Sequence, residues 1–216
     1  MFCLKTATLI IAAGLVSTIA PPAYGQKWEV GAGGGASIYK SSQITGRTAT
    51  VDAKFKPGYG FTGYVGQLGN RVGGEIRYSF FSNEMELSGG GKNFTMGGRS
   101  QAIHYDVLLY FNKRESKTRP YLLAGGGVKQ YTGTGNAVPL QPFISTAVLT
   151  NTSEWKPMIT AGAGVRFAMG AKTHLRIEVL SYMTQAPKNV ITPVNGAALD
   201  GWFLSFAPVF SVSYVW

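Results

Sequence analysis

The sequence is nearly devoid of cysteine: the only one among 216 residues is Cys3, which precedes the first apolar stretch. Residues 7–20 form that stretch, after the single charge of Lys5, and they fall short of the ~20 apolar residues that a membrane-spanning helix needs. Ala23 and Gly25 are small residues at the positions that a signal peptidase reads. We therefore expect a signal peptide over residues 1–25, cleaved before Gln26, with an uncleaved N-terminal anchor as the alternative.

Loss of Cys3 with the signal peptide would leave residues 26–216 without a thiol. This excludes a disulfide scaffold and a cysteine-based metal site for the mature chain. Charge is also scarce, at 14% of residues, whereas a water-soluble domain has about a quarter. No apolar run of helix-spanning length follows residue 25, although the composition is 45% hydrophobic and 12% aromatic. A membrane β-barrel has this composition because only every second residue faces lipid. A secreted β-sandwich has a compatible composition.

The C-terminal segment has the strongest pattern in the sequence. Apolar residues occupy alternate positions up to the last residue, and mostly small residues stand between them: Trp202, Leu204, Phe206, Pro208, Phe210, Val212, Tyr214 and Trp216. A period of two indicates a strand with one apolar face. Such a face would be an aggregation edge in water but suits contact with lipid.

The same alternation recurs along the chain and predicts eight strands, at residues 27–39, 56–66, 71–81, 101–112, 120–131, 157–168, 173–183 and 202–216. Three connections are short, at 68–70, 113–118 and 169–171. The long ones, at 40–55, 82–100, 132–156 and 184–201, are rich in polar residues and glycine. This asymmetry is typical of an outer-membrane barrel with short periplasmic turns and long outer loops. We predict an all-β fold: one eight-stranded antiparallel transmembrane β-barrel, an up-and-down meander, over residues 26–216.

With the apolar set facing lipid, the other face of each strand lines the lumen. The inward set contains nearly balanced charges: Glu29, Glu75, Arg77, His104, Asp106, Lys129, Arg166, Arg176 and Glu178. Eight strands leave an interior just wide enough for side chains, and buried opposite charges recover hydration energy by pairing. We expect an ion-paired plug. Inward glycines leave room for the long arginines or line a thin water path: Gly31, Gly33, Gly35, Gly162 and Gly164.

The chain resembles the small OmpA-like and OmpX-like outer-membrane barrels of Gram-negative bacteria, a group often called porin-family proteins. The residues that carry the resemblance are 119–128 (RPYLLAGGGV), 161–167 (AGAGVRF), 175–179 (LRIEV) and the aromatic strand ending in Trp216. The resemblance implies location in the outer membrane. It also implies that the last strand is an assembly signal read by the outer-membrane assembly machinery, through Phe210, Val212, Tyr214 and Trp216, although most members end in Phe.

No motif indicates an enzyme or a cofactor site. His104 and Asp106 share a strand face about 7 Å apart, but no His-x-Ser stands at a strand end, and structural pairing is the favoured interpretation. Residues 31–36 fit G-x-G-x-x-A, yet the helix that a dinucleotide site requires is not expected after them. We expect no cofactor, no metal and no catalytic residue.

The basic residues indicate which partners the chain could contact. Many stand in the long loops: Lys40, Arg47, Lys54, Lys56, Lys92, Arg99, Lys156 and Lys188. They either keep the loops soluble or meet lipopolysaccharide phosphates. Lys113, Arg114, Lys117 and Arg119 form a second cluster in an expected periplasmic turn. Dispersed charges disfavour nucleic-acid binding. The expected role is structural, or interaction with an unidentified extracellular ligand through the outer loops. A narrow channel and a lipid A-modifying or phospholipid hydrolase are alternatives.

Overall fold

The computed structural model describes residues 27–46, 49–136, 140–199 and 201–216. The predicted signal peptide lies outside these residues. Within the described part of the chain, no helix is long and apolar enough to cross a membrane.

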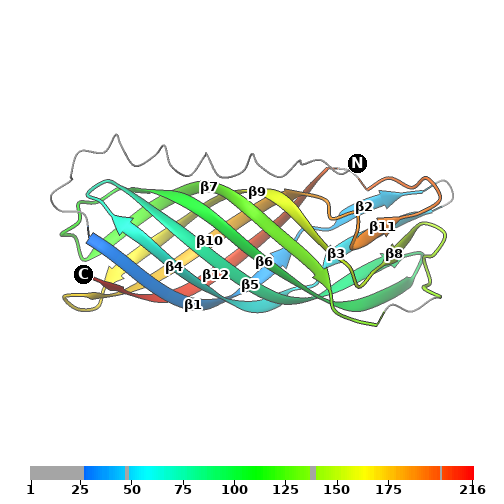
Figure 1. Ribbon diagram of the computed structural model, residues 1–216, viewed down its shortest axis with the longest axis horizontal. Helices are drawn as coiled ribbons and strands as arrows, with labels where there is room; N and C mark the ends of the chain where they lie inside the picture. Colours follow the sequence, from blue (N-terminus) through cyan, green and yellow to red (C-terminus); the bar gives the residue numbers. More distant parts are fainter. Residues whose placement is uncertain (1–26, 47–48, 137–139, 200) are drawn as a thin grey trace, which may run out of the picture.

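Eight long antiparallel strands form the wall of a barrel (Figure 1). They are β1 (Lys27–Tyr39), β4 (Gly58–Leu68), β5 (Val72–Gly89), β6 (Lys92–Tyr110), β7 (Thr118–Gly133), β9 (Ser153–Ala168), β10 (Thr173–Gln185) and β12 (Trp202–Val215). Each pairs with its neighbours along the chain, β1 pairs with β12, and the pairing of β5 with β6 completes the ring. The predicted all-β meander is confirmed.

Four short strands gather at one end of the barrel: β2 (Ser42–Thr45), β3 (Thr50–Phe55), β8 (Ala147–Leu149) and β11 (Ile191–Pro193) (Figure 1). The β2–β3 hairpin pairs with the far end of β5, and β8 pairs with β11. The three short turns and the C-terminus lie at the opposite end. In outer-membrane barrels the end with short turns faces the periplasm, so we name the other end outer.

The prediction of a loop over residues 82–100 was wrong. Strands β5 and β6 pair without interruption from Val72↔Leu109 to Gly89↔Lys92. Gly90 and Gly91 close the hairpin, with φ of 53° and 75°, a conformation that glycine adopts without steric cost.

The physical reason is an inversion of the apolar pattern along β5. Its outward side chains change from Ile76, Tyr78 and Phe80 to Glu84, Glu86 and Ser88. Its inward side chains change from Glu75 and Arg77 to Met85 and Leu87. A strand that leaves lipid for water must reverse its polar and apolar faces. A prediction based only on outward apolar residues therefore ends the strand at the membrane boundary, although the strand continues.

The outer ends of β5 and β6, together with β2, β3, β8, β11 and their connections, form a folded unit that we call the outer cap. It has its own buried core, which includes Ile44, Val51, Phe55, Met85, Leu87, Leu149, Ile191 and Leu199. Phe55 packs against Tyr39 and Phe203, which project inward from the outer ends of β1 and β12, with ring centroids 5.1 and 5.9 Å apart. The expected loops at 40–55, 132–156 and 184–201 therefore contain ordered strands that fold over the barrel mouth.

The outer face of the wall is apolar and exposed, as contact with lipid requires. Trp28 and Trp216 stand near its periplasmic edge, and Trp155 and Trp202 stand near its outer edge. Tryptophan side chains favour the boundary between lipid and water. The two pairs therefore mark the membrane-facing band.

Candidate functional site

The structure places all nine predicted lumen residues inside the barrel, each with at most 4% of its surface exposed. Four of them form one contact network, which we call the ionic layer: Glu75 and Arg77 from β5, and Arg176 and Glu178 from β10. The alternation of each strand puts its acid and its base on the same inward face. Strands β4, β1 and β12 separate β5 from β10 in the wall, so these contacts cross the lumen.

Each carboxylate of the ionic layer contacts both arginines. Glu75 accepts from Arg77 Nε at 3.0 Å and from Arg176 Nη1 at 2.8 Å. Glu178 accepts from Arg77 Nη2 at 2.8 Å and from Arg176 Nη2 at 2.7 Å. The Tyr121 hydroxyl donates to Glu178 at 2.7 Å and accepts from Arg176 Nε at 3.0 Å. Multiple charge-assisted hydrogen bonds offset the dehydration of four buried charges.

Two inward glycines make room for tyrosine rings beside this layer. A Cβ on Gly31 would overlap the ring of Tyr64, and one on Gly164 would stand 2.6 Å from Tyr121. The Arg176 guanidinium lies 4.1 Å from the Tyr64 ring centre and 5.2 Å from that of Tyr121. These glycines therefore accommodate aromatic partners of an arginine, whereas the sequence suggested room for the arginine itself or for water.

His104 and Asp106 lie beside the ionic layer on β6, in register with Arg77 and Glu75 respectively. His104 Nδ1 is 2.9 Å from Asp106 Oδ2, and Thr160 donates to the other carboxylate oxygen. The imidazole packs edge-on against Tyr182, with ring centroids 5.5 Å apart. Both side chains are enclosed, so the arrangement favours a structural pair over a catalytic one.

Lys129 has surroundings that its charge alone did not suggest. Its ammonium group donates to Ser205 at 3.0 Å and lies 4.8, 5.3 and 4.8 Å from the ring centres of Tyr39, Tyr131 and Tyr182. We call these three rings the tyrosine cage. None of the ion pairs found among the described residues includes Lys129. Cation–π attraction therefore replaces the expected acid partner.

A second charged group closes the lumen toward the periplasm. Arg166 Nε lies 3.3 Å from Glu29 Oε1, and Ser213 donates to the same carboxylate. Arg119, expected in the basic periplasmic turn, is instead an inward residue of β7 with 1% exposure. Its guanidinium stacks 3.8 Å above the Tyr110 ring centre and donates to the carbonyl oxygen of Asn70. The alternation that runs through Tyr121 and Leu123 could have identified it.

Three levels of side chains thus fill the interior, from Glu29 and Arg166 through the ionic layer to Lys129, and the core of the outer cap lies above them. Within the described ranges, no cluster of three or more His, Cys, Asp or Glu side chains could hold a metal ion. The arrangement can hold the wall strands together and obstruct passage through the lumen.

Residues 9–197 match the family model for the outer membrane protein beta-barrel domain. No curated protein matches the sequence significantly. The structure is similar to Neisserial surface protein A, with a TM-score of 0.53 and 12% identity over 88% of this chain and 98% of that one. It is also similar to a major outer membrane protein of Thermus thermophilus, with a TM-score of 0.52 and 13% identity over 89% and 100% of the two chains.

At these identities, the likeness to solved structures shows the fold alone. The family match covers most of the chain, and the ring of eight antiparallel strands with an exposed apolar wall agrees with it. The chain belongs to the outer membrane protein beta-barrel domain family and is a protein of the bacterial outer membrane.

Proposed function

We propose that this protein is a closed structural barrel of the outer membrane that presents its outer cap as a contact surface. The ionic layer is the observation that carries the proposal. Its four side chains have at most 3% exposure and join opposite walls of the barrel. A solute would have to separate these pairs and leave charges without partners, at a cost of several kcal/mol.

The outer cap supports the second half of the proposal. Its core is continuous with the aromatic side chains at the barrel mouth, so the cap forms a firm platform beyond the membrane. Ion pairs link β3 to β5 on its outer surface: Lys54 pairs with Glu86, and Lys56, just after β3, pairs with both Glu84 and Glu86. Leu140 and Ile144 are exposed apolar side chains on the same unit. Exposed apolar groups on a rigid, water-facing unit suit contact with another molecule.

Single-channel recording in a planar bilayer tests closure. Refolded protein, verified as compact by its heat-dependent gel mobility, should give no steady conductance steps. A porin reconstituted in the same bilayer is the positive control. Reproducible steps from folded protein would contradict the proposal and favour the narrow-channel alternative.

Thiol labelling provides an independent test, because Cys3→Ser removes the only natural cysteine. Ser79 is buried between Thr62 and Tyr182 in the lumen, whereas Ser153 is exposed at the outer end of β9. In the Cys3→Ser background, Ser153→Cys should react quickly with a water-soluble maleimide and Ser79→Cys only after unfolding. Equal labelling rates in the folded protein would show a continuous water path.

The contact role is tested on cells. The double variant Leu140→Ser and Ile144→Ser should reduce adhesion to arrays of immobilised glycans and matrix proteins, with unchanged amounts of folded barrel. Cells without the protein provide the baseline. If cells with the unmodified protein adhere no better than cells without it, the contact role is contradicted and only the structural role remains.

A further inference from the structure

The periplasmic end of the barrel carries basic side chains that acids do not balance. Exposed basic residues stand in or beside its short turns, and we call them the basic collar: Lys27, Arg71, Lys113, Lys117 and Lys172. Glu115 is the only acidic side chain among the described residues of these turns. None of the ion pairs found in the described part of the chain includes a collar residue. The rim that faces the periplasm is therefore positively charged.

The basic collar extends around the whole barrel. Each of the three periplasmic turns, and the place where β12 meets β1, carries at least one of its residues. In ring order, these are Lys27 on β1, Arg71 before β5, Lys113 and Lys117 between β6 and β7, and Lys172 before β10. Figure 1 shows the turns together at one end of the molecule. A single protein partner would contact one side of such a ring, whereas a lipid leaflet surrounds all of it.

The collar stands at the level of the lipid boundary. The Lys172 ammonium group lies 5.6 Å from the ring centre of Tyr214, an outward residue of β12. Exposed apolar side chains stand within three residues of the other collar positions or of Lys172 itself: Trp28, Val72, Phe111 and Met169. Aromatic side chains favour the membrane–water interface, where lysine and arginine place their charge among the headgroups. The collar cations are therefore at headgroup height.

Hydrogen bonds hold two of the turns to each other. The Arg71 side chain donates to the carbonyl oxygen of Phe111, and the Asn70 side-chain oxygen accepts from the backbone N–H of Arg114 at 3.2 Å. The turn before β5 is thus tied to the turn before β7. The wall and these bonds fix the spacing of the collar, so its charges are arranged before a ligand binds.

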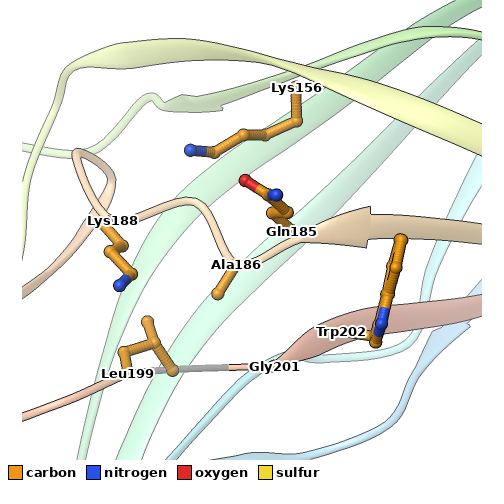
Figure 2. A pocket seen from close by; sticks show the side chains of 7 residues that line it. All are labelled: Lys156, Gln185, Ala186, Lys188, Leu199, Gly201 and Trp202. Carbon is orange, nitrogen blue, oxygen red and sulfur yellow. The ribbon is translucent and has the colours of Figure 1, made fainter.

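Several cations of the outer rim, by contrast, stand beside acids. Lys156, which Figure 2 shows above Gln185, pairs with Glu154 at 2.5 Å. Lys54 pairs with Glu86 at 3.4 Å. These acids offset the attraction of their cations for an anionic ligand, and the collar has no such ion pair among the described residues.

We propose that the basic collar binds anionic phospholipids of the inner leaflet through their headgroup phosphates. Ammonium and guanidinium groups form charge-assisted hydrogen bonds with phosphate, and each basic residue near an anionic bilayer surface adds to the attraction. A zwitterionic phospholipid offers the same phosphate, but its own ammonium group offsets the negative charge. The collar therefore selects anionic lipid and surrounds the periplasmic mouth with it.

The tryptophans allow this preference to be measured at the periplasmic rim alone. Trp155→Phe with Trp202→Phe leaves Trp28 and Trp216 as the only reporters. The folded protein is placed in vesicles that contain brominated phosphatidylglycerol or brominated phosphatidylcholine, and quenching of tryptophan fluorescence gives the relative binding constant of the two lipids. Phosphatidylglycerol should be preferred about fivefold at low salt. The preference should decrease at high salt, because ions screen exposed charges.

The test variant replaces three collar lysines in this two-tryptophan background: Lys113→Gln, Lys117→Gln and Lys172→Gln. Its preference for phosphatidylglycerol should fall below about twofold. The matched control makes the same charge change at the outer end: Lys40→Gln, Lys54→Gln and Lys92→Gln. It should keep the preference. If the test variant does not fold, Lys113→Gln with Lys117→Gln serves, because both side chains are exposed in one turn.

A preference that the test variant keeps would overturn the proposal, and so would an equal loss in the control variant. Equal quenching by the two lipids in the two-tryptophan background would also overturn it. If the folded protein then sediments with purified peptidoglycan and the test variant does not, the collar contacts the cell wall instead of the leaflet.

Discussion

Arg176 and Glu75 meet across the barrel, with Arg176 Nη1 2.8 Å from Glu75 Oε2, although 101 residues separate them in the sequence. The pair joins β10 to β5, strands that lie four steps apart in either direction around the ring, so they are directly opposite each other. It therefore connects two opposite strands of the wall that share no backbone hydrogen bond.

Glu75→Gln should lower the free energy of unfolding by about 3–5 kcal/mol, because it leaves two buried guanidinium groups with one carboxylate. Urea titration in lipid vesicles, followed by tryptophan fluorescence, measures this change. The double variant Glu75→Gln with Arg176→Met should lose less than the sum of the two single variants. Lys54→Met, which breaks a surface pair with Glu86, is the control and should cost about 0–1 kcal/mol. If the urea midpoint of Glu75→Gln is shifted no more than that of Lys54→Met, the ionic layer does not stabilise the barrel.

Lys129→Met should retain or increase stability. The ammonium group is buried with one hydroxyl partner and three tyrosine rings, which offset only part of its dehydration. Methionine has a similar length and brings no charge. Lys129→Ala leaves a cavity in the tyrosine cage and should cost about 2–5 kcal/mol. The same urea titration separates the two variants, and a Met variant as unstable as the Ala variant would show that the charge itself stabilises the cage.

Gly164→Ala should destabilise the barrel by about 1–3 kcal/mol through overpacking. The added Cβ would stand 2.6 Å from Tyr121 and 3.0 Å from Glu178, so Tyr121 would have to move away from Arg176. Gly63→Ala is the matched control, because its nearest neighbour is a backbone oxygen 3.8 Å away. Thermal unfolding compares the pair, and adding Tyr121→Leu to Gly164→Ala should restore part of the loss. Equal effects at Gly164 and Gly63 would contradict the packing argument.

The wall of the barrel was accessible to sequence reasoning because lipid imposes a strict period of two on every strand. The predicted fold class is confirmed, and the inward direction of Glu75, Arg77, Arg176 and Glu178 follows from the same parity. Their mutual contact does not follow from parity. The contact depends on the diameter of the barrel and on how far the two arginine side chains extend across it. The pattern of a single strand reveals neither.

The outer cap was missed for a related reason. At the membrane boundary β5 and β6 reverse their apolar face, so the outward pattern stops where the strands continue. Lys129 shows another limit of the sequence. The near balance of inward charges suggested an acid partner, whereas three tyrosines from β1, β7 and β10 surround it. Tyr131 is two residues from Lys129 on the same inward face of β7, but Tyr39 and Tyr182 come from distant strands and become its partners only when the ring is assembled.

The last strand allows a prediction about assembly in the cell. Trp216 is exposed, stacks on Tyr214 with centroids 6.3 Å apart, and exchanges backbone hydrogen bonds with Trp28 where β12 meets β1. If the machinery reads this aromatic end, Trp216→Ala should reduce the folded fraction in outer-membrane preparations severalfold, whereas Trp216→Phe should retain it. Refolding of the purified variants into detergent, where no machinery acts, is the control and should differ little between them. An equal loss in detergent would assign the defect to closure of the barrel between β1 and β12. Unchanged assembly of the Ala variant would remove Trp216 from the signal.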